Sequence, residues 1–193
     1  MSTPGTRFAT MVRTHEFEPL DDDAAADLFE LTRALTREAG LPAYEVSNHA
    51  RRGEESRHNL TYWRYQDYVG IGPGAHGRRG GMATVRHKKP ENWLAAVADR
   101  GDGLSEERVL SPNEQASEAL MMGLRLTEGI DLADLRERFG IPVSEMIDSK
   151  KFNFYQRKGL VGQDRALMWI TEAGMPLLDG LLSELICADL VSE

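Results

Sequence analysis

The chain has 193 residues, enough for one buried core or for a core with a small appended domain. Its hydrophobic content of 41% and charged content of 28% are typical of a globular protein. The net charge of −8 argues against bulk nucleic-acid binding, and no apolar run approaches the ~20 residues that cross a bilayer. No secretory signal is readable at the amino terminus, so we expect a cytoplasmic protein without a transmembrane segment.

Charge is distributed unevenly along the chain. Between Arg51 and Lys89, nine Lys and Arg stand against three Asp and Glu, a net charge of +6, and three of the five histidines lie there. From Ser105 to the end, nine Lys and Arg stand against sixteen Asp and Glu, a net charge of −7. The first segment favours an anionic ligand, whereas the second repels polyanions, so we expect no nucleic-acid partner.

The first half of the chain predicts alternating strands and helices. Prolines and glycines mark residues 1–20 as a loop. Asp21 is a candidate N-cap for a helix that runs to about Glu38 and stops at Gly40. Further along we expect three short strands, at residues 43–47, 68–72 and 83–87. A polar loop should cover residues 53–59, and a helix should run from Pro90 to Val97.

A shift in composition at residues 100–103 predicts a boundary between domains at 1–103 and 104–193. Beyond it the pattern is mostly helical, and Ser111 and Glu114 form a capping box. The expected elements are the helix after Ser111, a helix from Asp131 to Gly140, a helix over 144–158, a hairpin of 160–162 with 166–170, and a last helix capped by Thr171. This order is typical of a winged-helix-like domain.

Two motifs narrow the interpretation further: His58-Asn-Leu-Thr-Tyr-Trp63 and Gly70-Ile-Gly-Pro-Gly-Ala-His76. With Tyr44-Glu-Val-Ser-Asn48, they resemble the second half of HemW-type haem chaperones, radical-SAM relatives of the oxygen-independent coproporphyrinogen III oxidases. In that family an HNxxYW run marks the chaperone branch. Residues 107–174 resemble the family's winged-helix-type domain. The resemblance implies a partial α/β radical-SAM barrel over the first domain and a mostly helical winged-helix-like domain with one β-hairpin over the second.

The departure from that family is equally informative. Its members bind a [4Fe–4S] cluster through CxxxCxxC and S-adenosylmethionine through a glycine-rich stretch. Neither run is present, and Cys187, the single cysteine, is expected to be a small buried hydrophobe. A complete eight-unit barrel takes ~250 residues. We therefore expect a fragment, either a truncated protein or one half of a split gene, which is inactive as an enzyme by itself.

The HNLTYW motif supplies the candidate haem site. His58 is the candidate axial ligand of the iron, and Tyr62 is a rival as tyrosinate. Asn59 either orients the imidazole or caps a turn, and Tyr62 and Trp63 offer flat faces to a porphyrin. In the alternative, His58 and Trp63 only pack a loop onto the barrel. Candidate partners for the haem propionates are four arginines, namely Arg51, Arg52, Arg57 and Arg64.

The glycine-rich motif permits close backbone approach and positive φ. The resemblance implies that Ile71, Gly72, Gly74 and Ala75 lie beside the adenosyl part of S-adenosylmethionine; the alternative is a strand end with a tight turn. The spacing does not fit a dinucleotide fingerprint.

Three functions compete. The first is a haem chaperone that binds haem and passes it to an acceptor protein. The second is a porphyrinogen-oxidising enzyme of porphyrin biosynthesis, and the third is a non-catalytic half that completes a separately encoded amino-terminal half. The HNxxYW run favours the first over the second, whereas the missing cysteines favour the third for this chain alone.

Overall fold

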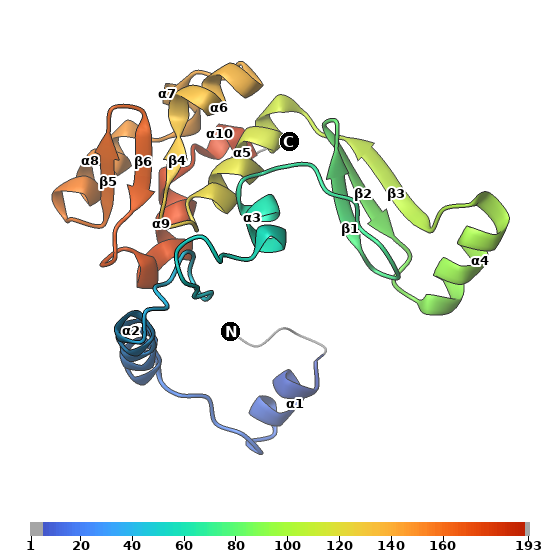
Figure 1. The fold of residues 1–193 in the computed structure, drawn as a ribbon, viewed down its shortest axis with the longest axis horizontal. Helices are drawn as coiled ribbons and strands as arrows, with labels where there is room; N and C mark the ends of the chain where they lie inside the picture. The colour runs from blue at the N-terminus through green and yellow to red at the C-terminus, as the bar shows by residue number, and fades with distance from the viewer. Residues whose placement is uncertain (1–5, 192–193) are drawn as a thin grey trace.

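The computed structural model describes residues 6–191, and Figure 1 shows a helical body on one side and an arm on the other. The arm consists of a three-stranded sheet and helix α4. The body holds the later helices, α5 to α10, around a second three-stranded sheet. Helix α1 lies apart from both, whereas α2 lies beside the body, where Phe29 packs against the core and Arg37 pairs with Glu172.

Two helices begin the chain. Helix α2 spans Asp22–Glu38, and the side chain of Asp21 accepts a hydrogen bond from the backbone N–H of Ala24, which confirms the predicted N-cap. Helix α1 spans Arg7–Arg13, so the prediction of a loop over residues 1–20 was wrong at residues 7–13 and is confirmed at 14–20, while residues 1–5 lie outside the described residues. The reason is a local cap that prolines and glycines nearby had obscured: the Thr6 hydroxyl accepts from the backbone N–H of Ala9.

Two predicted strands are absent from the described residues. Residues 43–47 form bends, with one isolated bridge between Ala43 and His49. At 68–72, Tyr68 forms a bridge with Arg78, but Val69 and Ile71 are 62% and 86% exposed. The segment cannot stay extended because Gly72 adopts φ +91°. The expected loop over residues 53–59 also ends early, since helix α3 spans Arg57–Trp63.

The arm is an antiparallel sheet in the order β1-β2-β3, made of His76–Arg79, Met82–Arg86 and Leu104–Val109. A Gly80-Gly81 turn with positive φ at both residues joins β1 to β2. Helix α4, Pro90–Arg100, connects β2 to β3, so the strand and helix expected at 83–87 and 90–97 are confirmed. Strand β3 was not predicted, because its charged sequence hides the strand pattern. The division of the chain into two domains at residue 103 stays a prediction.

The body starts with helix α5, Pro112–Gly123, and the predicted capping box of Ser111 and Glu114 is confirmed. Asp131 caps helix α6 as expected. The single helix expected over 144–158 was wrong: Ile147 is extended, and Asp148 caps a new helix with its carboxylate. The remaining helices are α6 (Leu132–Phe139), α7 (Val143–Met146), α8 (Ser149–Arg157), a 3₁₀ turn (Met175–Leu177), α9 (Leu178–Leu185) and α10 (Ala188–Val191).

The second sheet has the order β4-β6-β5, with strands Ile130–Asp131, Leu167–Ile170 and Val161–Asp164. The hairpin of β5 and β6 is confirmed, whereas the two-residue strand β4 is too short to be read from sequence. Thr171 does not start the last helix directly; its hydroxyl accepts from the N–H of Gly174, and the 3₁₀ turn intervenes before α9. The protein's core lies in this body and includes Leu120, Leu124, Met146, Met168 and Leu185, all almost fully buried.

Candidate haem site and the groove beside it

Helix α3 carries the HNLTYW motif. It begins at Ser56, whose hydroxyl accepts a hydrogen bond from the backbone N–H of Asn59 at 3.3 Å, and it ends where Tyr65 adopts φ +51°. In a helix, residues four apart lie on the same face. The local structure therefore divides the motif between two faces, one with His58 and Tyr62 and one with Asn59 and Trp63.

His58 and Tyr62 form the first of these pairs. The imidazole of His58 is exposed, and its Nε2 lies 2.7 Å from the Tyr62 hydroxyl. The two rings meet edge to face at 4.6 Å, and Tyr62 meets Tyr68 in the same manner at 4.4 Å. Burial raises the pKa of Tyr68. The pair thus presents a ring nitrogen and a phenol oxygen, both of which are haem ligand types, at one exposed position.

Asn59 contacts Tyr44 in an earlier motif of the chain. Its side-chain amide donates to the Tyr44 hydroxyl at 3.1 Å, so it ties α3 to the Tyr44–Asn48 motif. Within that motif Glu45 is fully buried and accepts hydrogen bonds from the N–H of Ser47 and the amide of Asn48. The contact with Tyr44 shows that Asn59 helps to position α3, and a role in orienting the imidazole stays a prediction.

The four arginines that are candidate partners of the haem propionates differ in whether they already form an ion pair. Arg64 donates two hydrogen bonds to Glu128, at 2.8 and 2.9 Å, and this partner raises the pKa of its guanidinium. Arg51 lies 3.6 Å from Glu54. Arg52 and Arg57 are exposed, and among residues 6–191 neither forms an ion pair within 4 Å. Arg57 is the first residue of α3, one position before His58.

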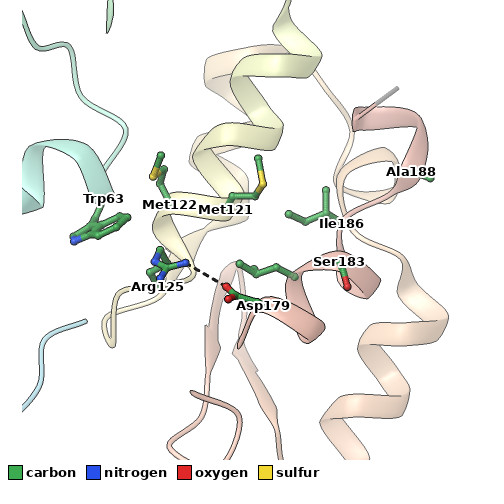
Figure 2. A pocket seen from close by; sticks show the side chains of 9 residues that line it. Trp63, Met121, Met122, Arg125, Asp179, Ser183, Ile186 and Ala188 are labelled. Carbon is green, nitrogen blue, oxygen red and sulfur yellow. Dashed lines mark hydrogen bonds and ion pairs between the residues drawn. The ribbon is translucent and has the colours of Figure 1, made fainter. Parts of the chain in front are cut away.

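Trp63 faces away from His58 and into a groove of about 830 Å³ between α3, α5, α9 and α10 (Figure 2). Five positions along a helix correspond to a rotation of about 140°, which separates the indole from the imidazole. The guanidinium of Arg125 lies 5.3 Å from the centre of the Trp63 ring. The sequence did not reveal this groove, since its other lining residues follow the same helical spacing as core positions: Met121, Met122, Arg125, Asp179, Leu182, Ser183, Ile186 and Ala188.

The glycine-rich motif forms an exposed loop before β1. Gly72 and Gly74 adopt φ +91° and +73°, and the N–H of Gly74 donates to the carbonyl of His87 at 2.9 Å. A Cβ on Gly70 would lie 2.1 Å from the carbonyl oxygen of His76, so the close approach requires glycine. Tyr68, two residues before Gly70, contacts Tyr62, and the loop is thus a neighbour of the His58 face.

Two features are absent from residues 6–191. No group of three or more His, Cys, Asp and Glu side chains is arranged to hold a metal ion in this part of the chain. No helix there combines the length and apolarity needed to cross a membrane.

Comparison with known proteins agrees with this architecture. Residues 110–177 match the family model described as the HemN C-terminal domain. The bovine protein named "Radical S-adenosyl methionine domain-containing protein 1, mitochondrial" is 35% identical, over 94% of this chain and 43% of its own length. The Bacillus subtilis protein named "Heme chaperone HemW" is 29% identical, over 89% of this chain and 45% of its own length.

A solved structure shows the same fold. Coproporphyrinogen III oxidase (HemN) from Escherichia coli, a radical SAM enzyme, aligns with a TM-score of 0.63 and 17% identity, over 82% of this chain and 40% of that one. The fold is thus that of HemN, with mixed helices and small antiparallel sheets. The chain belongs to the HemW/HemN-type radical-SAM proteins and matches their carboxy-terminal part, as the motifs predicted. It spans less than half the length of these relatives.

Proposed function

We propose that this chain is the haem-binding part of a haem chaperone, and that it binds haem through His58 and passes it to an acceptor protein. The observation that carries the proposal is the exposed imidazole on α3, whose Nε2 has the Tyr62 hydroxyl at 2.7 Å as its neighbour. The similarity to proteins named haem chaperones supports the choice of ligand.

The residues present fit a haem. An imidazole nitrogen is a ligand type for haem iron, and bound haem supplies an iron centre with one axial position for it. Arg57 offers a guanidinium to a propionate, and Tyr62 offers the edge of an aromatic ring. Ligation by Nε2 requires the Tyr62 hydroxyl to give up its hydrogen bond, and release of the haem restores that bond. A net hydrogen bond contributes about 0.5–1.5 kcal/mol, so this exchange weakens binding modestly and favours transfer.

The test is a haemin titration followed by the Soret band. We expect His58→Ala to abolish the Soret shift, whereas Tyr62→Phe leaves it nearly intact. His76→Ala is the matched control, because His76 is an exposed histidine on β1 outside the motif. If Tyr62→Phe abolishes the shift and His58→Ala retains it, tyrosinate is the ligand. If both variants bind as the parent does, the segment is structural packing and the proposal is wrong.

Transfer needs its own measurement. Haem-loaded protein mixed with apomyoglobin, used as a generic haem acceptor, should lose its Soret signature as the myoglobin spectrum appears. The parent should transfer haem to apomyoglobin faster than an unrelated protein surface to which haemin binds nonspecifically. Retention of haem by the protein in the presence of excess acceptor would contradict a chaperone role.

The iron–sulfur cluster does not fit this chain by itself. The family's cluster motif CxxxCxxC supplies three cysteine ligands, and the sequence has one cysteine, Cys187. We propose that a separate amino-terminal half supplies the cluster, and that Ile71, Gly72, Gly74 and Ala75 lie beside S-adenosylmethionine in the completed protein. Anaerobic reconstitution of this chain with iron and sulfide should give no 5′-deoxyadenosine, and robust formation would contradict the proposal.

We also propose a division of the chain into two domains. Residues 1–103 would be the closing part of a radical-SAM barrel, and residues 104–193 a winged-helix-like domain. Leu28, Leu31 and Leu35 support the first assignment, because they form an exposed apolar face on α2. A coproporphyrinogen oxidase is the alternative, and porphyrinogen consumption by the completed protein would favour it. We propose a cytoplasmic location for the chaperone.

A further inference from the structure

The groove beside Trp63 is a second feature of α3 that the haem proposal does not use. We infer that this groove is a seat for a planar tetrapyrrole with carboxylate side chains, separate from the His58 face and independent of a metal ligand. The choice of ligand class rests on the proposed haem-handling function. The inference that the groove is a binding site is argued from the residues that line it.

The lining suits a flat apolar body. Figure 2 shows the indole of Trp63 on one side and Ile186 and Ala188 on the other, with Met121 and Met122 reaching in from α5. The groove's volume of about 830 Å³ lies within the range of roughly 300–1,000 Å³ that is usual for small-molecule sites. Thioether side chains are polarisable and adapt to large flat ligands, and Met121 is 39% exposed here.

The polar groups suit a carboxylate. Arg125 is the cation of the groove, and its Nη1 meets Asp179 at 3.4 Å, a long contact to a highly exposed carboxylate. The Nε of Arg125 is buried and has no hydrogen-bond partner in the described structure, whereas the Nε1 of Trp63 points away from the groove in Figure 2. A guanidinium that is held only by a long contact to an exposed carboxylate is able to exchange that partner for an incoming carboxylate. Asp179 is easily displaced because it is largely solvated.

The groove and His58 lie on different sides of α3, and this arrangement decides how the groove would hold a tetrapyrrole. Trp63 is on the same helix as His58 but about 140° around it, so one macrocycle cannot occupy both positions. A tetrapyrrole in the groove would therefore have no imidazole ligand from His58. The groove would hold the macrocycle by its apolar faces and propionates, next to the site where iron is ligated.

Metal-free protoporphyrin IX separates the two sites, because it has no iron for His58 to ligate. Its binding to the whole chain is measured by porphyrin fluorescence. Met121→Arg and Ala188→Arg fill the groove from opposite walls at exposed positions, and each should weaken binding at least about tenfold. Leu31→Arg is the matched control, since it places the same charge on the exposed apolar face of α2, where Leu31 is 51% exposed. It should leave the groove's affinity unchanged.

The propionate contact has its own variant. Arg125→Gln should weaken binding of protoporphyrin IX about tenfold, and should make no difference for a protoporphyrin whose propionates are converted to amides. Equal weakening for both probes would overturn the carboxylate role of Arg125. Unchanged affinity in both groove-filling variants, or equal loss in Leu31→Arg, would overturn the groove as a seat.

Failure of this inference is distinct from failure of the proposed function. His58→Ala should abolish the Soret shift of haemin while leaving protoporphyrin IX binding unaltered. Loss of protoporphyrin IX binding in His58→Ala would show that there is one site rather than two and would overturn the second seat.

Discussion

The guanidinium carbon of Arg78 lies 3.6 Å from the centre of the Tyr65 ring, and both side chains donate to the same oxygen of Glu118. Tyr65 follows α3 directly, Arg78 is in β1 and Glu118 is in α5. Arg138 of α6 adds a hydrogen bond to the Tyr65 carbonyl at 2.8 Å. This buried contact therefore fixes the motif helix, the arm and the body relative to one another.

Tyr65→Phe should destabilise the protein by about 1–2 kcal/mol, because the ring stays while the hydroxyl's bond to a partly buried carboxylate is lost. Burial and the Glu118 partner raise the pKa of Tyr65 in the folded state. The folded state thus holds this proton more tightly than the unfolded state does. Its contribution is complete below the ordinary tyrosine pKa of about 10 and decreases as pH rises above that value.

Urea unfolding of parent and variant between pH 8 and 11 measures this directly. The difference in unfolding free energy between the parent and Tyr65→Phe should shrink above about pH 10. A difference that stays constant to pH 11 would contradict the assigned role of the hydroxyl.

Asn59→Ala should lower the unfolding free energy by about 0.5–1.5 kcal/mol, since the hydrogen bond to the Tyr44 hydroxyl is lost. Tyr44→Phe should have a similar effect, and the double variant should cost less than the sum of the two. Haemin titration of Asn59→Ala should still give a Soret shift, because Asn59 contacts Tyr44 and not the His58 imidazole. Strict additivity in chemical denaturation would rule out the direct bond.

Gly129→Ala should be strongly destabilising. Gly129 has φ +73°, and a Cβ there would lie 2.3 Å from the carbonyl oxygen of Met168 in β6. Gly159→Ala is the matched control, since its φ of +74° is almost the same and nothing lies within 4 Å of an added Cβ. The control should cost about 1–2 kcal/mol from backbone conformation alone, and Gly129→Ala clearly more. Similar melting-temperature losses for both would show that the β6 contact is unimportant.

Leu120→Ala and Leu31→Ala test where the stabilising core lies. Leu120 is fully buried in the body, so its truncation should cost about 2–5 kcal/mol. Leu31 is on the exposed face of α2, and its truncation should change the unfolding free energy by less than about 0.5 kcal/mol. A large effect of Leu31→Ala in thermal unfolding would mean that this face is covered in solution.

Much of the helical structure could be predicted because helix caps are local. Asp21, Ser111 and Asp131 each bond to backbone groups two or three residues away, so a short stretch of sequence contains the whole interaction. The same is true of the HNLTYW and glycine-rich motifs, which indicated the family without knowledge of any contact between them. The expected strands at 43–47 and 68–72 were wrong because a strand needs a partner, and propensity alone does not supply one.

The sequence placed the candidate haem residues in one short segment that was expected to be partly a loop; the structure shows them on helix α3, and their grouping was decided by tertiary structure. The sequence by itself determined that His58, Asn59, Tyr62 and Trp63 follow one another in a short arginine-flanked segment. Only the fold placed His58 on an exposed face, tied Asn59 to Tyr44 and turned Trp63 toward Met121 and Arg125. The physical reason is that the partners on α5, α9 and α10 lie some 60 to 125 positions further along the chain, and packing between distant segments leaves no trace in local spacing.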